Sequence, residues 1–531
     1  MIRLFNSMTQ RKEEFIPRTE GEVGIYCCGP TVYGLVHIGN ARPYVTFAVL
    51  RNWLRHRGLR VTLVENITDV DDKIIDRAAR EGRSAMEVAE EFTRAYHEDM
   101  GRLGERLCPD VEPRATEMIA EIIDLCRTLI AKSYAYEADG SVYFKVRSFA
   151  SYGKLSGQRV EELEQGVRVA SEPGKRDPLD FALWKAAKPG EPAWESPWGM
   201  GRPGWHIECS AMGLRYLGPG FDIHGGGRDL IFPHHENEIA QSEAAGLPFA
   251  RVWMHNGMIR SEGAKMAKSV GNIFLLREVL DRYADAENGD APIVLLYFLT
   301  THYRSPLEFS VEKLEGARAS YERLTGFVRD IDFRLARSAG DGGGEAADLA
   351  SRVERCRAAF EEHMDDDLNT AAALGELFAL IADTYRYLAA VDRGEQPLNS
   401  AAVRAARDAV TEFADLLLIR LPAVGAVRSG TRETPRGAAH TEATDGVACV
   451  TEGVVLPPAA RLAEEGRWGD LEFLYRERLA CGDPSYAVAL RDHSREQKDW
   501  ARSDTLRAEL QDAGFEVRDT KIGTQVVSKA R

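Results

Sequence analysis

The 531-residue sequence lacks any apolar run that approaches the roughly 18–20 residues needed to cross a membrane as a helix. Residues 1–11 also lack the apolar core of a secretory signal peptide. These two absences argue against a helical membrane protein and against secretion. They predict a cytoplasmic protein that makes no membrane contact.

Cysteine is scarce, with eight residues in the whole chain and no C-x-x-C pair. So few cysteines do not form the disulfide scaffold of a small secreted domain. In a cytosolic protein, cysteines are more often free, catalytic or bound to metal. The scarcity therefore directs attention to the position of each cysteine.

A basic excess is also missing, because 68 lysines and arginines face 83 aspartates and glutamates, a net charge of -15. This balance argues against a general polyanion-binding protein, although it permits local basic patches. The pattern G-x-x-x-x-G-K-[S/T] is absent as well, so a P-loop nucleotide site is not supported.

The first part of the chain has a strand–helix–strand pattern. Val23–Cys28 and Val61–Val64 are β-prone apolar runs, and apolar residues recur at helical spacing between Pro43 and Arg57. Pro43 suits a first helical turn and Gly58 suits a helix stop. A second unit of this kind runs from Gly204 to Trp253. The pattern predicts an α/β fold with a doubly wound parallel sheet.

An insertion over about 110–200 separates these two units. It combines a predicted helix, Glu117–Lys132, with a strand-like run, Ser141–Val146. Mainly helical sequence follows to about Leu421, and residues 425–459 are predicted to form a linker or an insertion. The last segment, 460–531, is predicted to hold two helices and then short strands at Glu516–Arg518 and Thr524–Val527.

Five residues suit a metal site: Cys28, Cys209, His234, His235 and Glu238. His234 and Glu238 are four apart and His235 and Glu238 are three apart, so either pair can share a helix face. Thiolate, imidazole and carboxylate groups are the usual ligands of tetrahedral zinc. With the cysteines far apart, spacing alone leaves an equal alternative, in which both are small buried residues on adjacent strands.

Histidines also gather in this region, because five of the twelve lie between His206 and His255. Several follow strand-like segments, which is where open α/β sheets bind their ligands. A cluster of imidazoles is hard to explain as core packing, so we expect a functional site here.

Three short segments suit a bound nucleotide. His37-Ile38-Gly39-Asn40 joins a strand to a helix, and a helix N-terminus attracts anions. Lys265 and Lys268, three apart in Lys265–Ser269, can converge on phosphates. Glycines 225–227 precede Asp229 and permit close backbone approach. Read singly, each also fits a plain turn, a solvated basic loop or a tight turn.

Taken together, these motifs resemble those of the cysteinyl-tRNA synthetases, a class I aminoacyl-tRNA synthetase family. The number, order and spacing of the matching segments make the resemblance specific. It covers most of the chain and is weakest in 330–460. The segments are Tyr26–Tyr33, His37–Asn40, Asn66–Lys73, Gly204–Met212, His224–Leu230, Pro233–Glu238, Met254–Gly257 and Lys265–Ser269.

The resemblance implies a Rossmann-type catalytic domain with an inserted connective peptide, then a helical bundle and a small α+β anticodon-binding module. The implied divisions are 1–110 and 201–260 for the two catalytic halves, 111–200 for the connective peptide, 261–315 for a stem-contact region, 316–424 for the bundle, 425–459 for the linker and 460–531 for the anticodon module.

The resemblance also implies roles for individual residues. One zinc ion per subunit would bind Cys28, Cys209, His234 and Glu238, which selects His234 over His235. Thr68, Trp205, His224 and Asp229 would line the cysteine pocket. ATP, with Mg²⁺, would be bound by His37, Gly39, Asn40, Lys265 and Lys268; of these, all but Gly39 are expected to be catalytic.

Two positions depart from the commonest family pattern. Asn40 stands where the family more often has histidine, and Ala267 stands where serine is commoner. Asparagine still donates a hydrogen bond, but one imidazole is missing. Lys265, Lys268 and Ser269 are kept, so we expect phosphate binding to survive.

The implied reaction explains the metal. Cysteine and serine have nearly the same shape, and shape alone discriminates poorly. Zinc prefers a thiolate to a hydroxyl, so a substrate thiolate bound to zinc would distinguish them. The cysteine carboxylate would attack the α-phosphorus of ATP and release pyrophosphate. The 3′ terminal adenosine of tRNA(Cys) would then accept cysteine.

The C-terminal segment Lys498–Arg507 also resembles the family. RNA loops are read by stacking and by contacts to base edges, and the resemblance indicates Trp500, Asp504, Arg507 and Asp519 as anticodon contacts. The alternative is that Trp500 packs inside a small helical module. The resemblance further favours a monomer.

Two other functions remain open at this point. One is a cysteine ligase with a small amine acceptor, as in the mycothiol pathway, which predicts no anticodon module. The other is a non-catalytic zinc-containing RNA-binding protein, which predicts eroded nucleotide segments. The extended C-terminus argues against the first, and intact His37, Lys265 and Lys268 argue against the second.

Overall fold

The computed structural model describes residues 1–162, 174–261, 264–265, 274–284, 290–337, 347–421, 485–512, 515–520 and 523–528. The chain forms two compact units. The first comprises Met1–Ile259, Phe274–Leu307 and Ala317–Pro422, and the second comprises Arg260–Ile273, Glu308–Gly316 and Ala423–Arg531. The predicted linker 425–459 lies outside the described residues. The seven-part division stays a prediction.

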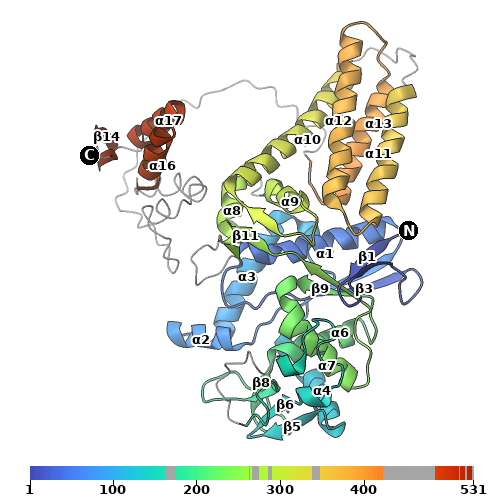
Figure 1. Cartoon of the computed structure of the whole chain (residues 1–531), viewed down its shortest axis with the longest axis vertical. Coiled ribbons are helices and arrows are strands. Elements are labelled where there is room, and N and C mark those ends of the chain that lie inside the picture. The colour runs from blue at the N-terminus through green and yellow to red at the C-terminus, as the bar shows by residue number, and fades with distance from the viewer. Residues whose placement is uncertain are drawn as a thin grey trace, which may run out of the picture. The chain divides into compact units, whose positions relative to one another are not determined.

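The core of the first unit is a parallel sheet with strand order β10-β9-β3-β4 (Figure 1). Its strands are β3 (Glu22–Cys27), β4 (Arg60–Glu65), β9 (Ile223–Gly227) and β10 (Val252–Asn256). Chain connections run outward from β3 to β4 on one side and from β9 to β10 on the other. The predicted doubly wound parallel sheet is therefore confirmed, and its topological switch point lies between β3 and β9.

Helix α1 (Ile38–His56) connects β3 to β4 and is almost wholly buried. The predicted start at Pro43 is wrong, because the helix begins five residues earlier. The Asn40 carboxamide accepts a hydrogen bond from the His37 backbone N–H at 3.1 Å, which caps the helix at His37. Pro43 therefore lies inside α1, where its missing N–H leaves the Gly39 carbonyl without its usual helical donor.

The insertion forms a separate antiparallel sheet of order β5-β6-β7-β8, with β5 (Ala135–Ala138), β6 (Ser141–Phe144), β7 (Phe181–Ala186) and β8 (Gly201–Pro203). Helix α4 (Ile119–Ala131) packs against it. Asp72, the first residue of α2 (Asp72–Glu81), pairs with Lys185 and Arg202 and so ties the insertion to the rest of the first unit.

The remaining elements before the bundle surround the parallel sheet. They are the hairpin β1 (Arg3–Asn6) and β2 (Arg11–Glu14), and the helices α3 (Ala85–Leu103), α6 (Trp205–Tyr216), α7 (Glu236–Ala244), α8 (Leu276–Tyr283) and α9 (Pro292–Leu299). A three-stranded sheet of order β12-β11-β13 follows, made of β11 (Ile259–Ser261), β12 (Ala264–Lys265) and β13 (Leu307–Phe309).

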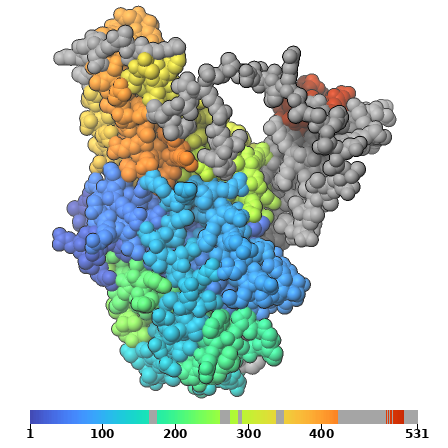
Figure 2. Space-filling model, turned by 180° about the vertical axis from the view of Figure 1, so that it is seen from behind, coloured from blue at the N-terminus to red at the C-terminus, as the bar shows by residue number. Residues whose placement is uncertain are grey.

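A helical bundle packs against α1 and the N-terminal hairpin (Figure 1), and Figure 2 shows the bundle from behind. Its helices are α10 (Val311–Arg337), α11 (Ala347–Asp365), α12 (Thr370–Asp392) and α13 (Ser400–Leu416). Asp367, between α11 and α12, is fully buried and accepts hydrogen bonds from the Phe5 N–H and the Tyr303 hydroxyl. Arg304 forms an ion pair with the same carboxylate. The Asp367 side chain therefore connects the bundle to the N-terminal hairpin, through Phe5, and to the segment that holds Tyr303 and Arg304.

The described C-terminal part contains α16 (Ser485–Glu496), α17 (Trp500–Asp512) and the antiparallel pair β14 (Phe515–Thr520) and β15 (Gly523–Ser528). The predicted order of two helices followed by two short strands is confirmed for the described residues. None of the helices in the described part of the chain is long and apolar enough to span a membrane.

Candidate active site and metal centre

The predicted metal ligands meet at the switch point of the parallel sheet. Cys28 follows the last residue of β3, and its N–H donates to the Gly225 carbonyl of β9 at 3.1 Å. Cys209 lies in α6, so the alternative that placed both cysteines on adjacent strands is wrong. His234 lies in the turn Ile231–His235, and Glu238 lies one helical turn later in α7.

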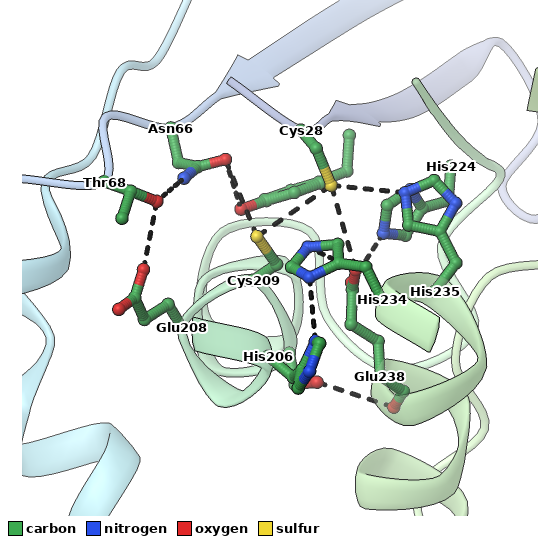
Figure 3. Close-up of polar contacts among 12 residues, drawn as sticks. Cys28, Asn66, Thr68, His206, Glu208, Cys209, His224, His234, His235 and Glu238 are labelled. Carbon is green, nitrogen blue, oxygen red and sulfur yellow. Dashed lines mark hydrogen bonds and ion pairs between the residues drawn. The ribbon is translucent and has the colours of Figure 1, made fainter. Parts of the chain in front are cut away.

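The four side chains point toward one another (Figure 3). All are buried, and their donor atoms lie within 4.8 Å of one another. Sγ of Cys28 is 3.9 Å from Sγ of Cys209 and 3.7 Å from Oε1 of Glu238, and His234 Nε2 is 3.1 Å from that oxygen. A tetrahedral zinc site separates its ligand atoms by roughly 3.3–3.8 Å, so these residues fit zinc.

A second set of four donors overlaps the first. Cys28, His224, His235 and Glu238 also bring one ligand atom each within 4.8 Å. His235 Nε2 lies 3.3 Å from Sγ of Cys28, and His224 Nε2 lies 2.7 Å from Oε2 of Glu238. The first set offers two sulfur ligands and the second set offers one, and two sulfur ligands suit a soft or borderline metal better than a single sulfur ligand does. Because both sets bring four donors together, the choice of His234 over His235 stays a prediction.

Burial controls the protonation of these groups. It lowers the pKa of His234 and of His235, which favours the neutral imidazole that binds metal. Burial raises the pKa of Glu238. A nearby cation acts in the opposite direction and favours the carboxylate, so metal binding and ionisation of Glu238 would support each other.

Two further hydrogen bonds hold the imidazoles in place. Nδ1 of His234 lies 2.9 Å from Nδ1 of His206. Nδ1 of His235 lies 2.9 Å from Nε2 of His255, whose own Nδ1 lies 2.8 Å from the Ser7 hydroxyl. Partners of this kind orient metal-binding histidines. The sequence predicted a functional site from the clustering of these histidines, but it did not predict which of them contact each other. No pattern in the sequence indicated Ser7.

Three of the four predicted pocket residues lie around the cluster. His224 contacts Glu238, the Trp205 ring lies 4.3 Å from the His234 ring, and the Thr68 hydroxyl donates to Glu208 at 3.0 Å. Asp229 lies two residues beyond β9 and is exposed. Glu208 and Asn66 form hydrogen bonds with the Thr68 hydroxyl, and the sequence did not predict a role for either residue.

The first nucleotide segment forms the N-terminus of α1. A Cβ atom at Gly39 would come within 2.9 Å of the His37 ring, so a larger residue here would displace that ring. The segment also pairs with residues that follow the lysine motif, because the Ile38 N–H donates to Phe274 and the Leu276 N–H donates to Val36, at 3.0 and 2.9 Å. The structure thus pairs residues 36–38 with residues 274–276.

The lysine motif itself is described only in part. Lys265 is the last residue of β12, for which the backbone alone is described, and Lys268 lies outside the described residues. Their predicted contacts with ATP stay predictions.

The predicted anticodon residues lie in the C-terminal part. Trp500, the first residue of α17, is 57% exposed, so the alternative in which it packs inside the module is not what the structure has. Asp504 is exposed and Arg507 is half-buried on the same helix. Asp519 lies in β14, where only the backbone is described.

Comparison with known families gives two matches. Residues 14–319 match the model of the class I tRNA synthetase (C) catalytic domain. Residues 359–421 match the DALR domain.

Curated relatives match over most or nearly all of the chain. A cysteine–tRNA ligase of Oleidesulfovibrio alaskensis is 44% identical over 98% of this chain and 99% of its own. One from Pelotomaculum thermopropionicum is 42% identical over 99% of both chains. One from Carboxydothermus hydrogenoformans is 51% identical over 72% of this chain and 80% of its own.

Solved structures support the fold. Mycobacterium tuberculosis methionyl-tRNA synthetase in complex with methionyl-adenylate has a TM-score of 0.56 at 15% identity, covering 75% of this chain and 90% of its own. A leucyl synthetase, Agrobacterium radiobacter K84 agnB2 LeuRS, in a ternary complex has a TM-score of 0.55 at 12% identity, covering 76% and 85%. At such identities the likeness concerns architecture alone.

Proposed function

The chain belongs to the cysteine–tRNA ligase family of class I tRNA synthetases, and we propose that it selects L-cysteine through a zinc ion held by Cys28, Cys209, His234 and Glu238. Its activity is ATP-dependent attachment of cysteine to tRNA. The observation that carries the proposal is the buried cluster of four donors at the switch point of the sheet. One zinc ion per subunit is expected.

The cluster suits this selection by its chemistry. Zinc supplies a soft Lewis acid that binds a thiolate far better than a hydroxyl. Cys28 and Glu238 come from opposite sides of the switch point, and the buried imidazoles are neutral and able to bind metal. The protein's part is to hold these ligands, to exclude water and to leave room for the substrate thiol beside Trp205.

Activation of cysteine is expected at the N-terminus of α1. His37, Gly39 and Asn40 would bind ATP, and Lys265 and Lys268, with Mg²⁺, would stabilise charge on the phosphates. The cysteine carboxylate needs no general base, since it is ionised at neutral pH. Asn40 already uses its carboxamide oxygen to cap α1, which leaves its N–H₂ group to donate to the nucleotide.

The specific tRNA is expected to be tRNA(Cys), with its anticodon contacted by Trp500, Asp504, Arg507 and Asp519. A monomer and a cytoplasmic location remain the expectations from the sequence. The alternative ligase with a small amine acceptor lacks support, since the relatives named above are tRNA ligases aligned over 98–99% of this chain. The non-catalytic alternative likewise disagrees with these relatives.

The test is charging of bulk tRNA with labelled cysteine or serine in the presence of ATP. We expect cysteine to be attached and serine to be rejected, with zinc present at one equivalent. Charging of both amino acids, or equal charging by protein stripped of metal, would contradict selection by the zinc site.

A further inference from the structure

Arg42 is a buried arginine near the start of α1, and it is 1% exposed. Its Nη1 group donates to the backbone carbonyls of Gly257 at 2.5 Å and of Ser305 at 2.7 Å. Its Nη2 group donates to the carbonyl of His302 at 3.1 Å. One side chain therefore joins the start of α1 to the residue after β10 and to residues 302–305.

This arginine is costly to bury, which indicates a role beyond packing. Among the described residues no carboxylate pairs with it, and its Nε has no hydrogen-bond partner. Burial lowers the pKa of Arg42 to about 10, so the guanidinium stays protonated at neutral pH. A cation is also unfavourable near the positive end of a helix dipole, and the first turn of α1, which is fully described, holds no acidic residue.

The first turn of α1 depends on contacts from outside the helix. Pro43 has no N–H, so the Gly39 carbonyl lacks the donor that a regular helix supplies. The same turn begins with residues 37–40, the predicted nucleotide segment. The Ile38 N–H makes one outside contact, to the Phe274 carbonyl. The Arg42 guanidinium adds three more.

The carbonyls that Arg42 contacts are themselves held in place. A Cβ atom at Gly257 would lie 2.3 Å from the Ser305 carbonyl oxygen, so only glycine permits this approach of the two backbones. The Gly257 N–H donates to the Tyr303 carbonyl at 2.8 Å. The Tyr303 hydroxyl donates at 2.7 Å to Asp367, the buried carboxylate between α11 and α12. The partners of Arg42 are therefore attached to both the sheet and the bundle.

We propose that Arg42 is a positioning residue for ATP, because it holds residues 37–40 in a fixed place against Gly257 and residues 302–305. The inference rests on the proposed function, in which His37 and Asn40 bind the nucleotide. Arg42 acts through that segment, since both of its terminal nitrogens are engaged with backbone carbonyls. Its contribution is geometric, because a shift of about 1 Å in a binding group is enough to weaken its contacts with a ligand strongly.

The test is cysteine-dependent pyrophosphate exchange by the full, zinc-loaded chain, with the KM for ATP and the KM for cysteine measured separately. We expect Arg42→Met to raise the KM for ATP about tenfold and the KM for cysteine less than about twofold. The zinc content should equal that of the parent. Helix α1 keeps a second contact with the end of β10, from Asn256 Nδ2 to the Thr46 hydroxyl at 2.6 Å, so we expect the variant to fold.

Arg51→Met is the matched control. Arg51 lies on the same helix, is 6% exposed and donates to the backbone carbonyls of Arg106 and Cys108. Both substitutions should lower the melting temperature, but Arg51→Met should keep the KM for ATP of the parent. Arg42→Lys retains the charge without the planar fork of donors, so it should also raise the KM for ATP. If Arg42→Met does not fold, Arg42→Lys and Arg51→Lys provide the same comparison.

A double-mutant cycle with His37→Ala shows whether Arg42 acts through the nucleotide segment. If it does, Arg42→Met should raise the KM for ATP less in the His37→Ala protein than in the parent, because a contact that it positions is already lost. Effects that simply multiply would overturn the proposal. So would an unchanged KM for ATP in Arg42→Met or Arg42→Lys, or an equal rise in the matched Arg51 variant.

The cycle also separates this inference from the proposed function. If His37→Ala raises the KM for ATP and Arg42→Met does not, only the role of Arg42 fails. If His37→Ala leaves that KM unchanged, the nucleotide role of residues 37–40 fails, and the inference about Arg42 fails with it.

Discussion

Glu65 is a buried acid that the zinc site does not use. It is the last residue of β4, is 1% exposed and receives a hydrogen bond from the Tyr96 hydroxyl. Burial raises the pKa of Glu65 to about 8, against an ordinary value of 4.5. At neutral pH the folded protein therefore keeps this carboxyl protonated, whereas the unfolded chain releases the proton.

This difference predicts a pH dependence of stability. Because the folded state binds the extra proton, the contribution of Glu65 to stability is complete below about pH 4.5 and falls as pH rises to about 8. Glu65→Gln removes this loss, so its melting temperature should exceed that of the parent by about 1–4 °C at pH 8.5 and by less at pH 5. Thermal melts at both pH values check it. If the two proteins differed in melting temperature by the same amount at both pH values, the titration assigned to Glu65 would be wrong.

The two overlapping ligand sets make opposite predictions for single residues. Cys209 belongs only to the set with two sulfurs, and His235 belongs only to the other. We expect Cys209→Ser to lose zinc during dialysis against a weak chelator and to lose cysteine-dependent pyrophosphate exchange. His235→Asn should retain close to one equivalent of zinc. Metal analysis after dialysis measures both, and the reverse pattern would assign the metal to the second set.

At the scale of elements, the first nucleotide segment is tied to the start of α8. Residues 274–276 pair with residues 36–38, and α8 begins at Leu276. Arg277 in its first turn donates to Asp99 of α3 at 2.8 Å and pairs with Glu98 at 2.8 Å. Helix α8 is thus held at the start of α1 and on α3.

Arg277→Met tests this link. Without the guanidinium, the buried Asp99 loses its counter-charge and α8 loses its ion pairs with Glu98 and Asp99 of α3, while the pair between Arg102 and Asp281 remains. The KM for ATP in cysteine-dependent pyrophosphate exchange should rise several-fold, with a smaller change in the KM for cysteine. Arg127→Met is the control, since Arg127 is exposed and, among the residues that the structure describes, pairs only with Asp124 of its own helix. An Arg277→Met enzyme with the ATP dependence of the parent would refute the coupling.

At the scale of the molecule, the metal cluster and the C-terminal helices belong to different compact units. This division predicts that tRNA recognition can fail without loss of amino-acid activation. Trp500→Ala removes an exposed ring suited to stacking on an unpaired base, worth about 1–3 kcal/mol. We expect kcat/KM for tRNA to fall about fivefold to a hundredfold, with cysteine-dependent pyrophosphate exchange unchanged.

Trp500→Phe serves as the conservative variant and should restore most of the charging, because a phenyl ring also stacks. Loss of charging in both variants together with normal melting would indicate a contact through the indole N–H. Parallel loss of pyrophosphate exchange would show that Trp500 supports the fold rather than tRNA binding.

Local signals in the sequence were sufficient for the architecture. Alternating β-prone runs and helical periodicity over residues 23–64 predicted parallel strands, because a helix between two strands returns the chain in the same direction. The start of α1 was missed, since Pro43 is the stronger start signal and the cap formed by Asn40 depends on a side-chain conformation. The C-terminal strands were found because their pattern is short-range.

The sequence by itself determined which kinds of donor are present, that Cys28 lies at the end of the predicted strand Val23–Cys28, and that His234 and Glu238 are four apart. Only the tertiary structure decided which of them meet. Cys28, Cys209, His234 and Glu238 come from four separate elements, so their distances depend on how α6 and α7 pack over the sheet. That packing also placed His235 and His224 beside the same sulfur and carboxylate, and it placed Glu208 against Thr68. Long-range packing sets these distances, and no spacing along the chain encodes them.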